Sequence, residues 1–131
     1  MLPWVDGYIG IPYLEHGRDA WGCDCWGLVR MILAEQFGVE LPSVDGYSEV
    51  NPGATKRLVS ETLAAIETTV VDAPEPGDIV LMRLGPHPSA HVGVVVAPGL
   101  MVHTDRGINS TLARLDAPLI RNRIEGYYRV C

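Results

Sequence analysis

The sequence predicts an α+β fold in which helices come first and an antiparallel sheet follows. Apolar residues recur at helical spacing from Cys25 to about Gly38, and again from about Ala54 to Ile66. The second half of the chain instead holds short strand-like runs, two of them joined by a tight turn at Pro98-Gly99. This order of elements favours helices packed on an antiparallel sheet.

The composition is that of one globular domain spanning residues 1–131, with 47% hydrophobic and 20% charged residues. Ten Lys and Arg against sixteen Asp and Glu give a net charge of −6, and the chain has no basic block. We therefore expect neither nucleic acid nor an anionic membrane surface as a main partner. No apolar run approaches transmembrane length, so no membrane insertion is expected.

The cysteines and the N-terminus point to a cytosolic site of synthesis. Cys23 and Cys25 are separated by one residue, and Cys131 makes the count odd, so we expect reduced thiols. The segment Met1–Asp6 lacks the basic region and long apolar stretch of a signal peptide. The expectation is a protein made in a bacterial cytoplasm without a signal peptide.

The first half of the chain reads as an arm followed by two helices. Residues 1–24 are rich in Gly, Pro, Tyr and Trp, which predicts turns and an extended arm with a short helix near Trp4–Ile9. Asp24 is a suitable N-cap for the first long helix, and Gly38 is a suitable left-handed stop. Residues 41–47 are expected to form a connecting loop before the second helix.

The second half reads as strands and turns. Pro and Gly break the chain at Pro74–Asp78 before the apolar run Ile79–Met82, and Gly85–Pro88 is a predicted turn. Two strands are predicted next, Val92–Ala97 and Leu100–Thr104. A polar stretch without a predicted element follows from Asp105 to Asn122, and the last predicted strand is Ile124–Val130.

Cys25 is the candidate nucleophile. It stands at the predicted helix start, where unpaired backbone N–H groups stabilise a thiolate. A free cysteine is more often a small buried apolar residue, and residue chemistry alone leaves both roles open. Gly27 in the first turn indicates close packing or access. Cys23, just outside the helix, is assigned a structural role.

Two histidines occupy strand-like runs. His91 comes before Gly93, whose missing side chain lets another group approach closely. His103 follows on the next strand, and the hairpin between them makes neighbouring positions feasible. One imidazole can take a thiol proton while a second polar group orients it. The alternative for His91 is a histidine at a strand end that is satisfied by hydrogen bonds and has no catalytic role.

The remaining histidines are weaker candidates, and no metal is expected. His87 lies between two prolines in the predicted turn and is expected to be exposed, and His16 lies in the N-terminal arm. The Cys23-x-Cys25 pair has no second pair at the spacing that zinc sites use.

Five segments together resemble the NlpC-like cell-wall peptidases, a papain-fold cysteine peptidase family. They occur in family order: Gly10-Ile11-Pro12-Tyr13, Asp24-Cys25-Trp26-Gly27-Leu28-Val29, Pro76-Gly77-Asp78-Ile79-Val80, His91-Val92-Gly93-Val94 and His103. The resemblance implies a papain-like fold with a nucleophile at a helix start packed on an antiparallel sheet. It implies Cys25 as nucleophile, His91 as base and His103 as orienting residue, with substrate-binding residues Tyr13, Asp24 and Trp26.

The chain looks closest to the family branch carried by phage tails and related gene-transfer particles. The residues that carry this resemblance are Asp24 to Arg30 and the closing segments 115–118 and 121–129. The implied partners are peptidoglycan stem peptides and tail-tip or baseplate proteins. The implied location is a virion or tail that acts on the periplasmic cell wall.

Trp26 departs from the family pattern. The usual wall hydrolases carry a serine after the cysteine, and this serine helps to recognise the free amine of the stem peptide. Trp26 has no hydroxyl, so an intact, glycan-linked stem is an alternative substrate.

Together with these residues, the resemblance leaves three functions open. The first is a cysteine endopeptidase that cuts stem peptides at the γ-D-glutamyl–diaminopimelate bond without a cofactor. The second is an N-acetylmuramoyl-L-alanine amidase of the related CHAP type, which uses the same cysteine and histidine. The third is a tail-tip or baseplate component without catalytic activity.

Overall fold

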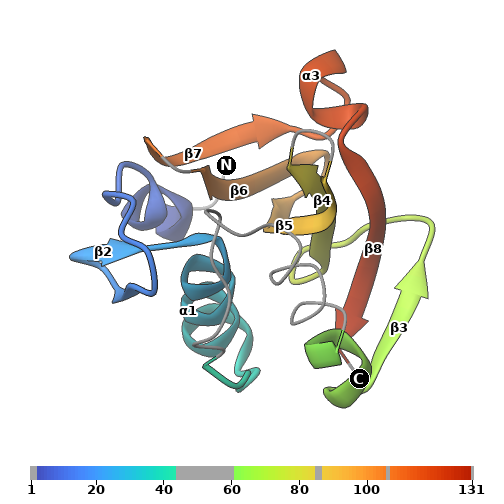
Figure 1. Ribbon diagram of the computed structural model, residues 1–131, viewed down its shortest axis with the longest axis horizontal. Helices are drawn as coiled ribbons and strands as arrows, with labels where there is room; N and C mark the ends of the chain where they lie inside the picture. The colour runs from blue at the N-terminus through green and yellow to red at the C-terminus, as the bar shows by residue number, and fades with distance from the viewer. Residues whose placement is uncertain (1–2, 44–60, 85–86, 106, 131) are drawn as a thin grey trace.

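The protein was analysed as a computed structural model, which describes residues 3–43, 61–84, 87–105 and 107–130. Its centre is a six-stranded antiparallel sheet with the strand order β3-β8-β4-β5-β6-β7 (Figure 1). The strands are β3 Thr68–Val71, β4 Ile79–Leu84, β5 His87–Ala97, β6 Leu100–Asp105, β7 Ile108–Arg114 and β8 Ile124–Val130.

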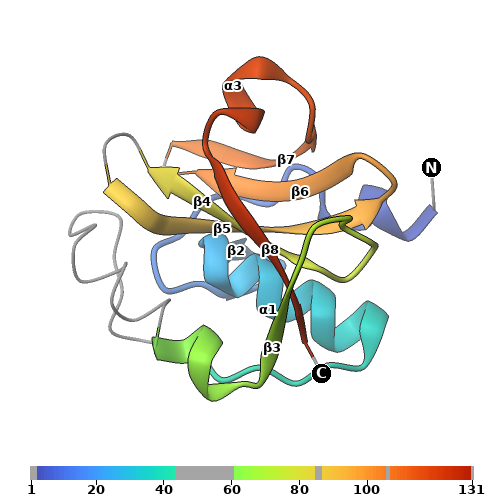
Figure 2. The ribbon, with the colours of Figure 1, turned by 90° about the vertical axis from the view of Figure 1, so that its right-hand side faces the viewer.

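The N-terminal part lies against this sheet. A 3-10 helix, η1 (Pro3–Tyr8), leads to a short hairpin of β1 (Arg18–Asp19) and β2 (Gly22–Cys23), and helix α1 (Cys25–Phe37) follows directly. Helix α1 packs on β5 and β6, and Figure 2 shows it on one side of the sheet, away from the short helix α3 (Pro118–Arg121). The expected α+β fold, with a helix packed on an antiparallel sheet, is confirmed.

Both predicted ends of α1 are confirmed. The Asp24 side chain accepts a hydrogen bond from the Gly27 backbone N–H, as an N-cap does. Gly38 closes the helix with φ +67°, a left-handed conformation that glycine adopts without a steric penalty.

The core has two parts, one on each face of the sheet. The larger part joins α1 to alternate residues of the sheet, among them Leu28, Ile32, Val92, Val94 and Val102. The smaller part lies between the opposite face and the C-terminal segments, and contains Val80, Met82, Val95, Met101 and Leu115. Burial on both faces explains why β4 and β5 read as nearly continuous apolar runs.

The hairpin of β5 and β6 and the last strand are also confirmed. Gly99 has φ +75° in the turn between β5 and β6, and Val94 pairs with Val102 across it. The described part of the chain has no helix long and apolar enough to cross a membrane.

The prediction of a featureless polar stretch from Asp105 to Asn122 is wrong. This stretch contains β7 and α3. Strand β7 lies at the sheet edge, and most of its residues are exposed or half-buried, so its sequence lacks the apolar alternation that reveals a strand. The edge strand β3, Thr68–Val71, was not predicted for the same reason.

Two further expectations are only partly tested. Residues 61–65 are helical, and the rest of the predicted helix from Ala54 lies largely outside the described residues, as do positions 44–47 of the loop. Positions 85 and 86 of the predicted turn also lie outside them. His87 and Pro88 belong to β5, and His87 pairs with Leu84, so the prediction of a turn is wrong for these two residues.

Candidate functional site

The Asp24 carboxylate fixes the start of α1 and thereby the position of Cys25. The carboxylate is completely buried and accepts hydrogen bonds from the backbone N–H groups of Gly27 (2.9 Å) and His16 (2.7 Å). It also pairs with the Arg18 guanidinium at 2.9 Å. Cys25 therefore directly follows a residue that two groups of the N-terminal arm, the His16 N–H and the Arg18 guanidinium, hold in place.

Gly27 and Gly17 let the first turn of α1 pack tightly against the arm. A Cβ at position 27 would lie 2.1 Å from the Gly17 carbonyl oxygen, and a Cβ at position 17 would lie 2.3 Å from the Gly22 carbonyl oxygen. No side chain fits at such distances. Of the two roles expected for Gly27, the structure therefore supports close packing.

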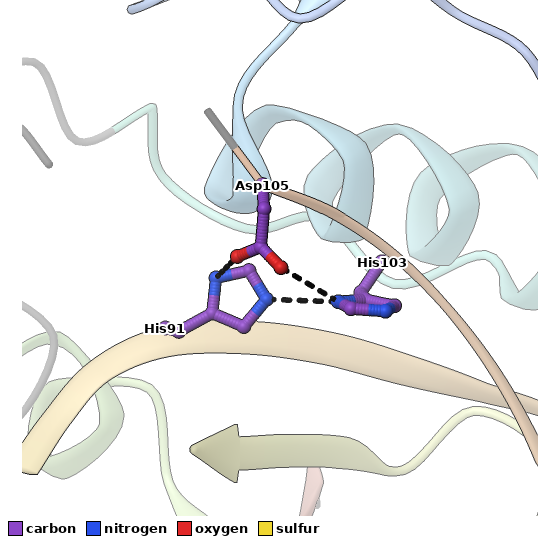
Figure 3. Close-up of side chains that lie close together, drawn as sticks. All are labelled: His91, His103 and Asp105. Atoms are coloured by element: carbon purple, nitrogen blue, oxygen red, sulfur yellow. Dashed lines mark hydrogen bonds and ion pairs between the residues drawn. The ribbon is translucent and has the colours of Figure 1, made fainter. Parts of the chain in front are cut away.

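His91 and His103 meet on adjacent strands. His91 Nε2 lies 3.0 Å from His103 Nδ1, and both rings are buried (Figure 3). A Cβ at Gly93 would lie 3.1 Å from the Cβ of His103, so the missing side chain makes room for this ring. The hairpin thus brings the two predicted histidines into contact.

Asp105 is the site residue that the sequence reasoning missed. It lies at the end of β6, where its Oδ1 is 3.3 Å from His91 Nδ1 and its Oδ2 is 3.8 Å from His103 Nδ1 (Figure 3). Its position two residues after His103 was the available signal, because alternate residues of a strand point to the same face. The sequence analysis instead placed Asp105 at the start of a polar stretch.

Burial and charge act against each other in this cluster. Burial lowers the pKa of His91 to about 3, and Asp105 is the largest opposing influence. Burial likewise lowers the pKa of His103. Burial raises the pKa of Asp105, but His91, Arg123 and His103 outweigh it, so this pKa lies below its ordinary value. The resting cluster therefore holds neutral imidazoles beside a carboxylate.

The three predicted substrate-binding residues differ in their placement. Tyr13 is half-buried and forms a backbone bridge with Cys23, two residues before Cys25. Trp26 is 1% exposed, and its indole Nε1 donates to the Pro42 carbonyl oxygen at 2.8 Å. Because Trp26 and Asp24 are buried and bound to protein groups, their placement gives no support to direct substrate contact. Asp24 instead joins the start of α1 to the N-terminal arm, and Trp26 joins α1 to Pro42.

The other cysteine and the weaker histidines have structural placements. Cys23 is buried, and this burial raises the pKa of its thiol to about 12, which fits the structural role predicted for it. Neither Cys23 nor Cys25 forms a disulfide, and Cys131 lies outside the described residues. His16 donates its backbone N–H to Asp24.

Within the described residues, His91, His103 and Asp105 are also the group whose donor atoms lie close enough together to hold a metal, within 4.8 Å of one another. These atoms are directed at each other. In addition, the Arg123 guanidinium lies 3.5 Å from Asp105 Oδ2, where its charge opposes a second cation. This arrangement suits proton exchange among the three side chains better than it suits a bound cation.

Solved structures share this fold. An NlpC/P60 family protein from Bacillus cereus superposes with a TM-score of 0.66 at 21% identity, over 94% of this chain and 36% of that one. The NlpC/p60 domain of the peptidoglycan hydrolase SagA gives 0.60 at 22% identity, over 95% of this chain and 89% of that one. Both show the papain-like architecture expected from the sequence.

A curated relative matches at the sequence level. The murein DD-endopeptidase and murein LD-carboxypeptidase MepS of Escherichia coli is 28% identical over 121 residues, which make up 92% of this chain and 56% of that protein. The chain thus spans about half the length of this curated relative. The NlpC/P60 family model matches residues 10–129, which include Cys25, His91, His103 and Asp105. The chain belongs to the NlpC/P60 family.

Proposed function

We propose that this chain is a cysteine peptidase that hydrolyses peptidoglycan stem peptides. The observation that carries the proposal is the pairing of two elements. A buried cysteine opens a helix held by Asp24, and this helix packs on the two strands that bring His91 and His103 within 3.0 Å. The match to the NlpC/P60 family supports a cell-wall substrate.

The proposed chemistry has two half-reactions, and His91 transfers protons in both. His91 takes the Cys25 thiol proton, and the thiolate attacks the carbonyl carbon of the scissile amide. The backbone N–H of Cys25, at the helix start, stabilises the oxyanion. The imidazolium of His91 then protonates the leaving amine, which leaves a thioester on Cys25. A water molecule deprotonated by His91 hydrolyses this thioester and restores the thiol.

His103 keeps the His91 ring in place during both proton transfers. Its Nδ1 contacts His91 Nε2, so the other nitrogen of His91, Nδ1, is the one that exchanges protons.

The bond we propose is the γ-D-glutamyl–diaminopimelate bond of the stem peptide. The Gly10-Ile11-Pro12-Tyr13 arm favours an endopeptidase over an amidase. The Escherichia coli relative is named as a DD-endopeptidase and LD-carboxypeptidase, so cross-linked stems and tetrapeptide stems belong in the same test.

We further propose that a phage tail or related particle carries this domain to the periplasmic cell wall, after synthesis in the bacterial cytoplasm. The proposal rests on the resemblance of segments 24–30, 115–118 and 121–129 to the tail-borne branch. Tail-tip or baseplate proteins are then its partners. Detection of the chain by mass spectrometry in purified particles tests this, and its absence from them would contradict it.

The first experiment is mass spectrometry of purified peptidoglycan and of defined muropeptides after incubation with the protein. The expected product is a new diaminopimelate amino end, absent with Cys25→Ala. Cys23→Ala is the matched control, because it removes a buried thiol two residues away that is not assigned to the chemistry. Circular dichroism should show both variants folded.

Other cleavage products would indicate other activities. Release of whole stem peptides from glycan would make the protein an amidase, and cleavage of cross-links or of a terminal D-residue would place it with its curated relative. Activity that survives Cys25→Ala would refute the assigned nucleophile.

A further inference from the structure

Asp105 makes a contact that the proposed chemistry has not used. Its two carboxylate oxygens lie 3.3 Å from His91 Nδ1 and 3.8 Å from His103 Nδ1, so it faces both rings at once (Figure 3). Of the two, the contact with His91 is shorter and involves the nitrogen assigned to proton exchange. The carboxylate therefore lies where a proton on His91 would carry its positive charge.

Arg123 approaches the same carboxylate from the other side. It lies between α3 and β8, and its NH1 is 3.5 Å from Asp105 Oδ2. Its Nε donates to the Arg83 carbonyl oxygen at 3.1 Å, which fixes the guanidinium against β4. Asp105 is thus shared between an imidazole that becomes charged during the reaction and a permanent cation.

The charged and titratable groups around His91 come from three directions. Strand β6 supplies Asp105 and His103, the segment before β8 supplies Arg123, and α1, which begins with Cys25, packs on β5. The β4 residue paired with His91 is Met82, which does not titrate. Among these groups, Asp105 favours a charged His91, whereas His103 and Arg123 oppose it, as burial does.

We propose that Asp105 is a positioning residue that stabilises the imidazolium form of His91 during proton transfer, and that Arg123 limits this stabilisation. The inference rests on the proposed function and deepens it. A completely buried imidazole is a weak base, because burial penalises its charged form. Asp105 offsets this penalty at the atom that accepts the proton, and the positive charge of Arg123 opposes the charge on the imidazolium.

The test compares Asp105→Asn, Arg123→Gln and Arg123→Lys with the wild type. NMR of protein labelled in its histidines follows the pH midpoint of the His91 imidazole. The expected shifts have opposite signs, about one pH unit downward for Asp105→Asn and a similar shift upward for Arg123→Gln. Arg123→Lys keeps the positive charge and should stay near the wild type. Asp116→Asn is the control, since Asp116 forms an exposed pair with Arg114.

Activity supplies the second readout. Asp105→Asn should lose about tenfold in kcat/KM on the muropeptide, which corresponds to one pH unit of lost basicity, while Asp116→Asn should keep wild-type activity. The limb of the pH–rate profile that reports His91 should move with the NMR midpoint.

Two results would overturn the inference. One is an unchanged His91 midpoint in both Asp105→Asn and Arg123→Gln, and the other is a shift of the same sign in both. A general loss of folding would lower activity without moving the pH profile in opposite directions. The NMR titration needs no substrate, so it decides the role of Asp105 even if the wild-type protein fails to cleave peptidoglycan.

Discussion

Replacing Asp24 by alanine should destabilise this protein more than any exposed substitution, because one buried carboxylate serves three donors. The loss of an N-cap costs about 1 kcal/mol. The change also leaves the Arg18 guanidinium and the His16 N–H without their buried acceptor, and breaking one side of a buried ion pair costs about 3–5 kcal/mol. These contributions overlap, so we expect a loss of about 4 kcal/mol in the free energy of unfolding.

Urea unfolding followed by circular dichroism measures this loss, and a thermal melt provides a second value. With an unfolding entropy of about 2.1 cal/mol/K per residue, a loss of 4 kcal/mol lowers Tm by about 15 °C for a chain of this length. Asp116→Ala is the matched control, since its ion pair with Arg114 is exposed and should contribute less than about 1 kcal/mol.

A double-mutant cycle with Arg18→Ala separates the ion pair from the cap. The pair lies at 2.9 Å with side chains 16% and 0% exposed, so a coupling of about 1–3 kcal/mol is expected. A total loss below about 1 kcal/mol for Asp24→Ala would refute the reasoning. It would mean that the three hydrogen bonds to Asp24 stabilise the fold no more than hydrogen bonds from the same donors to water.

Three further predictions concern other contacts. Gly93→Ala should reduce hydrolysis far more than it reduces the free energy of unfolding, because the added Cβ would lie 3.1 Å from the Cβ of His103. Equal losses of free energy in a thermal melt and in the rate of hydrolysis would contradict this. Asp78→Ala should lower the free energy of unfolding by about 3 kcal/mol in urea, because it removes a buried acceptor that binds two nitrogens of Arg129; a loss below about 0.5 kcal/mol would argue against it. The pKa of His91 falls from 6.5 to about 3 on folding, so the unfolded chain binds more protons than the folded chain between these two pH values. The free energy of unfolding therefore decreases as the pH falls through this range, by at most about 1.4 kcal/mol per pH unit. Urea melts at several pH values should show this slope in the wild type and a smaller one in His91→Gln.

The parts of the fold that the sequence predicted are those with a strong local signal. Helix α1 has an apolar stripe, an N-cap and a left-handed glycine, and each of these acts within the helix itself. The hairpin of β5 and β6 has two apolar runs and a Pro-Gly turn. Strands β3 and β7 were missed because they are edge strands with little buried surface, and their pairing partners are what make them strands.

The site divides in the same way. His91 and His103 stand in recognisable strands, so their proximity followed from the hairpin. Asp105 comes after the predicted end of its strand, and the pairing of β6 with β7 shifts register between His103 and Asp105. Arg123 lies about twenty residues further along the chain, and no local pattern connects it to Asp105. The burial of Trp26 likewise depends on the Pro42 loop, a contact that sequence spacing does not reveal.

The two parts of the proposed site, Cys25 and the histidine pair, lie in segments that are far apart in the sequence. The two histidines belong to one hairpin and are twelve positions apart in the sequence, so their contact is local and needs only the pairing of β5 with β6. Cys25 joins them only when α1 docks on the finished sheet, a contact that spans more than sixty residues. Synthesis therefore produces the thiol long before its base. A chain in which α1 has not docked on β5 and β6 does not bring Cys25 to the histidines, so the proposed hydrolysis requires the complete fold.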